Sequence, residues 1–111
     1  MKHIKTLKAY EHAINTNEYT VMIYYSDWCY DCHYMDTYLP KLEEAFPKLT
    51  FYKVDREQVK SLSIHLNIYG VPSLLFYHKD KIVKSYIDKK RKSFIEVTAF
   101  LEQCQNEMER R

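Results

Sequence analysis

Residues 28–32 read Trp28-Cys29-Tyr30-Asp31-Cys32, and they follow closely on the apolar run Tyr19-Thr20-Val21-Met22-Ile23-Tyr24-Tyr25. A short run rich in β-branched and aromatic residues, bounded here by Ser26-Asp27, is typical of a strand buried on both faces. After the second cysteine, apolar residues recur at helical spacing and predict one amphipathic helix that Pro47 closes: Met35, Leu39, Leu42, Ala45 and Phe46. The two cysteines are therefore expected at a junction between a central strand and a helix.

Two cysteines three positions apart at the start of a helix suit thiol-disulfide exchange. In this chemistry a thiolate attacks a disulfide, so one thiol must be exposed and have a lowered pKa, and a second must lie within bonding reach. Residues three apart share one helical face, and a helix N-terminus offers free N–H groups and partial positive charge to the first sulfur. We therefore expect Cys29 to be the nucleophile and Cys32 the resolving thiol.

The other segments alternate between strand and helix patterns. The predicted elements are a strand at 2–5, a helix that Thr6 caps, the strand at 19–25, the helix after the cysteines, a strand at 50–54, a helix at 57–66, strands at 73–77 and 82–87 joined as a hairpin, and a final helix opened by the capping box Ser93-Phe94-Ile95-Glu96. This order predicts an α/β fold with a mixed central β-sheet flanked by helices on both faces. With 111 residues and no linker or repeat, the chain suits one domain over 1–111.

Two motifs give the chain a resemblance to the thioredoxin family. Trp28-Cys29-x-x-Cys32 resembles the W-C-x-x-C active site of that family, and Gly70-Val71-Pro72-Ser73 is similar to its cis-proline loop. The resemblance implies a thioredoxin-like fold in which Pro72 is cis and packs against the active-site sulfurs. It also implies that the backbone at Val71 pairs with a substrate strand and that Trp28 shields the site.

The departures from the family pattern concern the surroundings of the cysteines. Tyr30-Asp31 stands where many thioredoxins have Gly-Pro, and an acidic residue there is similar to small thioredoxin-like proteins of low-GC Gram-positive bacteria. A carboxylate at Asp31 is expected to raise the pKa of Cys29 while the helix start lowers it.

Ile23 stands where many members carry a buried aspartate, although Lys53 matches the lysine often found beside it. The proton of Cys32 must then go to another group, with Asp31, Asp27 or water as the candidates.

The resemblance implies a thiol-disulfide oxidoreductase that reduces protein or small-thiol disulfides through a redox-active Cys29-Cys32 disulfide, with no metal or organic cofactor. We expect its partners to be disulfide-containing proteins and either a partner reductase or a low-molecular-weight thiol. The 17 Lys and Arg are interleaved with 15 Asp and Glu, which argues against nucleic acid. No long apolar run indicates a membrane, so we expect a cytoplasmic monomer.

Other interpretations of the cysteines remain open at this stage. The enzyme could instead reduce mixed disulfides of a low-molecular-weight thiol through Cys29 alone, or the fold could serve as a binding module with weak turnover. Cys29-Tyr30-Asp31-Cys32-His33 also spells the C-x-x-C-H signature for haem attachment, which would leave Trp28 and the Pro72 loop without a role. Zinc would require four ligands, and the remaining cysteine, Cys104, falls on the apolar stripe of the last helix. We expect Cys104 to be packed in the core.

Overall fold

The computed structural model describes residues 1–110, so that Arg111, the last residue of the predicted domain, lies outside the described residues. Strands and helices alternate along most of the chain, as the sequence predicts. The elements are β1 (Lys2–Ile4), α1 (Leu7–Thr16), β2 (Tyr19–Tyr25), α2 (Tyr30–Asp36), α3 (Leu39–Ala45), β3 (Thr50–Asp55), α4 (Lys60–His65), β4 (Ser73–His78), β5 (Lys81–Tyr86) and α5 (Phe94–Glu109).

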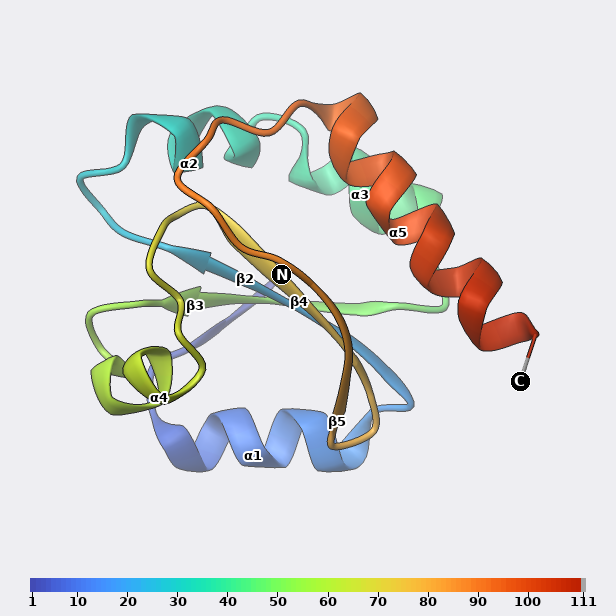
Figure 1. Cartoon of the computed structure of the whole chain (residues 1–111), viewed down its shortest axis with the longest axis horizontal. Coiled ribbons are helices and arrows are strands. Elements are labelled where there is room, and N and C mark those ends of the chain that lie inside the picture. The colour runs from blue at the N-terminus through green and yellow to red at the C-terminus, as the bar shows by residue number, and fades with distance from the viewer. Residues whose placement is uncertain (111) are drawn as a thin grey trace.

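The strands form one mixed sheet in the order β1-β3-β2-β4-β5. Strands β1 and β2 both run parallel to β3, whereas β4 runs antiparallel to β2 and β5 antiparallel to β4. Helices α1 and α4 lie on one side of this sheet, and α2, α3 and α5 lie on the other (Figure 1). The predicted α/β class, with a mixed sheet and helices on both faces, is confirmed.

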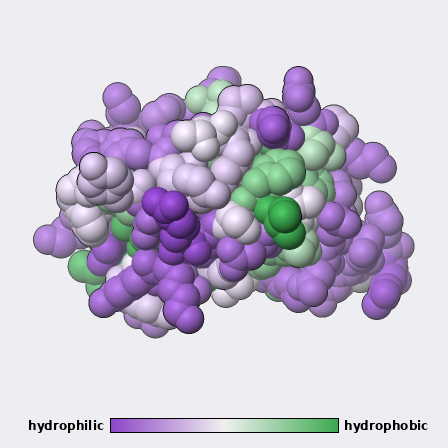
Figure 2. Space-filling view, turned by 90° about the horizontal axis from the view of Figure 1, so that it is seen from above, coloured by the Kyte–Doolittle hydropathy of each residue, from purple (hydrophilic) through white to green (hydrophobic). Residues whose placement is uncertain are grey.

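Strand β2 occupies the centre of the sheet and contributes to a core on each face. Val21 and Ile23 belong to the apolar cluster under α2, α3 and α5, and Met22 and Tyr24 belong to the cluster on the side of α1. All four are at most 1% exposed, which confirms a strand buried on both faces. The surface on the side of α2, α3 and α5 is largely hydrophilic, with hydrophobic residues gathered mainly in one area and a few others near the edges (Figure 2). The apolar sides of these helices thus face the sheet.

The prediction of one continuous helix after the cysteines was wrong. Helix α2 ends at Asp36, and α3 begins at Leu39 after Tyr38, whose φ of −118° and ψ of 0° are not helical. Pro40 in the first turn of α3 explains the break, because proline has no N–H to donate and its ring clashes with the carbonyl four residues earlier. In a continuous helix that carbonyl would belong to Asp36.

The prediction of a helix over 57–66 was wrong at its start, since α4 spans only Lys60–His65. A turn precedes it, in which an Asp55 carboxylate oxygen accepts a hydrogen bond from the Glu57 N–H at 2.9 Å. This contact satisfies a backbone donor outside the helix and follows the turn-forming habit of aspartate. The chain therefore forms a turn after Asp55, and α4 begins only at Lys60.

Candidate active site

Cys29 occupies the N-cap of α2, directly after the loop that leaves β2. Its sulfur accepts a hydrogen bond from the Cys32 N–H at 3.1 Å, the contact that serine, threonine or aspartate side chains make at many helix starts. Cys29 and Cys32 are joined by a disulfide with their Cα atoms 5.2 Å apart, and both are buried. The helix start therefore places one sulfur against a free backbone donor and a second sulfur within bonding distance.

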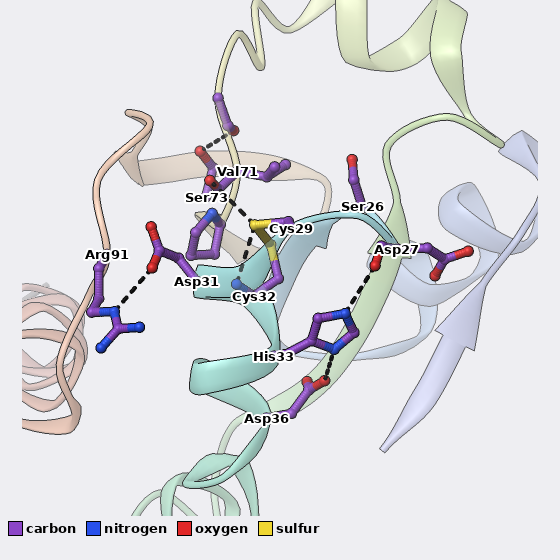
Figure 3. Close-up of a disulfide and its surroundings, with 12 residues drawn as sticks. Ser26, Asp27, Cys29, Asp31, Cys32, His33, Asp36, Val71, Ser73 and Arg91 are labelled. Atoms are coloured by element: carbon purple, nitrogen blue, oxygen red, sulfur yellow. Dashed lines mark hydrogen bonds and ion pairs between the residues drawn. A yellow bond between two sulfur atoms is a disulfide. The ribbon is translucent and has the colours of Figure 1, made fainter.

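The Pro72 loop closes over the disulfide from the other side of the site. The carbonyl oxygen of Val71 lies 3.7 Å from Cys29 Sγ, and the Val71–Pro72 peptide bond is cis. Ser73 Oγ steadies the loop by donating to the Gly70 carbonyl at 2.6 Å. Figure 3 shows Val71 and Ser73 beside the two sulfurs. The fold thus brings together the two motifs that lie far apart in the sequence.

The segment between β5 and α5 supports the Pro72 loop from behind. Lys92 is fully buried, and its ammonium group donates to the Pro72 carbonyl, to an Asp88 carboxylate oxygen at 2.7 Å and to the Lys90 carbonyl at 2.9 Å. A Cβ on Gly70 would lie 2.5 Å from the Asp88 carbonyl oxygen, so the only glycine in the chain permits this close backbone approach. Sequence reasoning missed Lys92, because a run of basic residues is typical of a solvated surface.

Asp31 lies at the start of α2 and forms an ion pair across the site. Its carboxylate contacts Arg91 Nε at 2.9 Å, and the Arg91 guanidinium lies 4.2 Å from the centre of the Tyr34 ring (Figure 3 shows the ion pair). The sequence did not indicate Arg91, whose guanidinium compensates the charge of the Asp31 carboxylate. The effect of Asp31 on the thiol of Cys29 stays a prediction.

The surroundings of Ile23 show where the predicted lysine points. Ile23 is buried in the apolar cluster under α2, and its Cα partner on β3 is Lys53. The Lys53 ammonium extends to Asp36 Oδ1 at 2.7 Å and lies 4.3 Å from the centre of the Tyr25 ring. Sequence reasoning missed Asp36, although its position one turn after Cys32 could have indicated it. The carboxylate beside Lys53 therefore comes from Asp36 on α2, and not from β2, which carries Ile23.

His33 connects this carboxylate to the loop after β2. Its Nδ1 lies 3.9 Å from Asp36 Oδ2, and its Nε2 lies 2.8 Å from the Asp27 carbonyl oxygen (Figure 3). Its side chain is exposed, which agrees with the surface position expected from the sequence. A series of polar contacts therefore flanks the turn that carries the cysteines, on the side away from Arg91. It links Asp27, His33, Asp36 and Lys53.

Three aromatic side chains stand around the disulfide. Trp28 is 70% exposed, Tyr30 86% and Tyr69 50%. They border a hollow of about 450 Å³ at the disulfide, whose lining is Trp28, Cys29, Tyr30, Asp31, Arg56, Tyr69, Gly70, Val71 and Lys89. The hollow gives a partner molecule access to Cys29, while the shielding role expected of Trp28 stays a prediction.

Cys104 takes no part in this site. It is fully buried on α5 against the sheet, and burial raises the pKa of its thiol to about 12. Its predicted place in the core is confirmed. Over the part of the chain that the structure describes, no group of three histidine, cysteine or acidic residues is arranged to hold a metal ion. Within the same residues, no helix combines the length and the apolar character needed to cross a bilayer.

Comparison with known proteins gives consistent matches. The thioredoxin family model matches residues 2–101. The mitochondrial thioredoxin-2 of Schizosaccharomyces pombe is 27% identical over 84 residues, covering 72% of this chain and 63% of that protein, so the match spans less than two thirds of that relative. A thioredoxin of Mycoplasmoides gallisepticum is 26% identical over 87 residues, covering 78% of this chain and 87% of the relative.

A solved structure of Plasmodium falciparum thioredoxin superposes with a TM-score of 0.83 at 18% identity. The superposition covers 93% of this chain and 98% of that one. At this identity the likeness concerns the fold alone, and it extends over nearly the whole chain.

Proposed function

The chain belongs to the thioredoxin family, and we propose that it reduces disulfides of protein substrates by dithiol exchange through Cys29 and Cys32. Members of this family are thiol-disulfide oxidoreductases. The observation that carries the proposal is the placement of Cys29 at the N-cap of α2, with its sulfur hydrogen-bonded to the Cys32 N–H and joined to Cys32 in a disulfide. A sulfur held in this way is stabilised as a thiolate when the disulfide is reduced.

The reaction proceeds in two exchanges that balance electrons and protons. The Cys29 thiolate attacks one substrate sulfur, the substrate disulfide breaks, and the released thiolate takes up a proton from water. The Cys32 thiol then gives its proton to water and attacks Cys29 Sγ, which breaks the mixed disulfide and releases the second substrate thiolate, and this thiolate takes up a proton from water in turn. Two electrons pass to the substrate, and the protein is left with the Cys29–Cys32 disulfide.

The groups around the sulfurs suggest roles in holding the substrate. The Val71 carbonyl beside Cys29 Sγ supports the proposal that a substrate segment lies along this loop. Trp28 and Tyr30, both exposed at the hollow, offer apolar surface to that segment. Lys53 supports the site indirectly, because its ion pair holds Asp36 next to the turn that carries the cysteines.

The reduced protein must be regenerated by a partner. A reductase or a low-molecular-weight thiol would supply the two electrons, and we propose that this occurs in the cytoplasm, where thiols are kept reduced. One copy of the chain carries both sulfurs, so a monomer is sufficient for the reaction. Cys32 within bonding distance of Cys29 favours the dithiol route over the reduction of mixed disulfides by Cys29 alone.

Trapping experiments test the proposal. Pre-reduced Cys32→Ser protein, mixed with a disulfide-bonded peptide, is expected to accumulate a mixed disulfide on Cys29, because the second exchange is blocked. Cys29→Ser should not react, and Cys104→Ala serves as the control that turns over like the unmodified protein. Mass spectrometry of proteolytic fragments locates the adduct. An adduct found chiefly on Cys104 in Cys32→Ser, or on Cys32 in Cys29→Ser, would contradict the assignment.

A further inference from the structure

Two hollows adjoin on the face that carries the disulfide. The first, of about 450 Å³, contains Cys29, and the second, of about 250 Å³, lies against α4. They share Arg56 and Tyr69 in their linings, so the two hollows are adjacent, and the exposed side chain of Ile64 borders the second. We name the surface formed by both hollows the disulfide groove. Because it extends from the disulfide to α4, it suits a polypeptide segment better than a small thiol.

In the disulfide groove, the basic side chains without an ion-pair partner outnumber the acidic ones. Its basic side chains, Arg56, Lys60 and Lys89, form no ion pair with any residue in 1–110. Its acidic side chains are fewer, because the Asp31 carboxylate is paired with Arg91, and only Glu57, whose Oε1 accepts a hydrogen bond from Ser26 Oγ at 3.2 Å, adds an uncompensated negative charge. The groove therefore presents free positive charge among exposed aromatic and apolar side chains.

We propose that the disulfide groove selects polypeptide substrates with acidic residues beside the disulfide to be reduced. This inference rests on the proposed function and adds the substrate class. Carboxylates on the substrate would meet Arg56 and Lys89, which line the same hollow as Cys29, while Trp28, Tyr30 and Tyr69 contact the apolar part of the segment. A guanidinium pairs with a carboxylate in a bidentate geometry, and complementary charge raises the rate of productive encounter.

Asp27, an exposed acid in the loop before Cys29, is not among the residues that line either hollow. The positive charge of the groove is local rather than a property of the whole chain, whose formal net charge is only +2. The preference should therefore respond to substitutions in the groove and not to net charge in general.

The experiment compares three disulfide-bonded peptides of equal length whose flanking residues are three glutamates, three glutamines or three lysines. The measured quantity is the second-order rate constant for oxidation of the pre-reduced protein in stopped flow. At low ionic strength we expect the glutamate peptide to react about 10-fold faster than the lysine peptide, within the range of electrostatic steering. Added salt should shrink this ratio, because exposed charges are screened beyond about 10 Å at 0.1 M.

Substitutions locate the effect in the groove. In the Arg56→Gln/Lys89→Gln variant the glutamate-to-lysine ratio should fall to within about twofold of unity, since the steering charges are gone. The matched control is Lys41→Gln/Lys81→Gln, which removes the same charge from exposed positions that line neither hollow. This control should keep the ratio of the unmodified protein.

The outcomes separate this inference from the proposed function. If all three peptides are reduced at equal rates, or if the control pair lowers the ratio as much as the groove pair, the substrate preference is wrong and the proposed function stands. If no peptide is reduced, the proposed function fails and the preference with it. If the Arg56→Gln/Lys89→Gln variant slows the reduction of oxidised glutathione but leaves the rates of all three peptides unchanged, the polypeptide occupant is wrong.

Discussion

A tyrosine cluster under α1 and a lysine cluster behind the Pro72 loop both bury polar atoms, but only the lysine cluster is charged. In the tyrosine cluster the Tyr10 hydroxyl receives a hydrogen bond from Tyr24 at 2.8 Å and lies 2.6 Å from the Tyr77 hydroxyl. All three rings are at most 3% exposed. The cluster ties α1 to the two central strands β2 and β4 without burying a charge.

In the lysine cluster a fully buried ammonium group joins backbone carbonyls of two loops to the Asp88 carboxylate. The Lys92 ammonium also lies 4.9 Å from the centre of the Tyr86 ring. Burying a charge is unfavourable unless several partners satisfy it, and here three acceptors do so. Neutral polar contacts thus suffice to pack a helix on the sheet, whereas the loop at the active site is held by a charged group with several acceptors.

We expect the largest effect from a substitution that disrupts the lysine cluster. Lys92→Met should lower the free energy of unfolding by about 2–4 kcal/mol, because it leaves the Pro72 and Lys90 carbonyls and the Asp88 carboxylate without their buried donor. Equilibrium urea unfolding measures this loss. The rate constant for peptide disulfide reduction should also fall, since the Pro72 loop loses its support next to Cys29.

Lys81→Met provides the control for Lys92→Met, as Lys81 is exposed on β5. It should change stability by less than about 0.5 kcal/mol, as surface substitutions usually do. If Lys92→Met is equally mild, the ammonium group does not hold the loop, and the contrast between the two clusters disappears.

A somewhat smaller effect is expected from opening the tyrosine cluster. Tyr10→Phe removes the central hydroxyl and leaves those of Tyr24 and Tyr77 without their partner, which should lower the free energy of unfolding by about 1–3 kcal/mol. The triple variant with phenylalanine at all three positions should regain part of that loss, because no buried hydroxyl is then left unsatisfied. Urea unfolding of both variants measures the difference. A triple variant less stable than Tyr10→Phe would contradict this explanation, because it would show that the hydroxyls stabilise the fold by more than hydrogen-bonding to one another.

The two clusters should limit stability at opposite ends of the pH scale. Burial, together with the neighbouring tyrosines, raises the pKa of Tyr10, and burial also raises the pKa of Tyr24 and of Tyr77. Their contribution is fully present below the unfolded pKa of about 10 and is lost as the pH rises above it.

For Asp88, partial burial alone raises the pKa, but hydrogen bonds from Lys92 and from the Lys90 N–H outweigh it and lower the pKa. Its contribution is present above the unfolded pKa of about 4 and is lost as the pH falls below it.

Unfolding free energies measured between about pH 2.5 and pH 11 test this contrast, because this range includes the unfolded pKa of aspartate and that of tyrosine. Relative to the unmodified protein, Tyr10→Phe should flatten the alkaline decline and Asp88→Asn the acid decline. The opposite assignment, or no change at either end, would contradict the comparison. Because the Asp88 side chain is about one third exposed, the acid effect should be the smaller of the two.

The smallest effect is expected at the ion pair between Asp31 and Arg91, whose side chains are 35% and 56% exposed. Arg91→Gln should change the free energy of unfolding by less than about 1 kcal/mol, as is usual for exposed pairs. It should raise the pKa of Cys29 by up to about half a unit, because the Asp31 carboxylate then acts on the thiol without compensation.

The rate of Cys29 alkylation against pH measures this shift in the reduced protein. In the Asp31→Asn background Arg91→Gln should no longer raise the pKa, because the charge that it uncovers is absent. A pKa that rises equally in both backgrounds would show that Arg91 acts on the thiol directly.

Much of the fold was predictable because its signals are local. The apolar run at 19–25 is buried on both faces, and the capping box at Ser93 and Glu96 is present at the start of α5. The cysteines lie at the strand-to-helix junction that their neighbours indicate. Even the break between α2 and α3 has a local cause in Pro40, which sequence reasoning weighed too lightly against the apolar spacing.

The partners of charged residues were not predictable in the same way. Lys89, Lys90, Arg91 and Lys92 read as one basic run, yet one lines the disulfide groove, one binds Asp31 and one is fully buried behind Pro72. Asp36 likewise became part of the site only when β3 placed Lys53 beside it. These assignments depend on residues 20 or 60 positions away, such as Pro72 and Asp31.

The alternation of strands and helices, the burial of β2 and the pair of sulfurs at a helix start are properties of local sequence. Each of these follows from hydrophobic periodicity and backbone preferences within about 10 neighbouring residues. Which charges are free, paired or buried depends on the folded arrangement, because an ion pair requires distances of a few ångströms between segments that the chain order does not relate. The active-site chemistry is therefore visible in the sequence, whereas the electrostatic surface that would choose its substrates appears only in the folded protein.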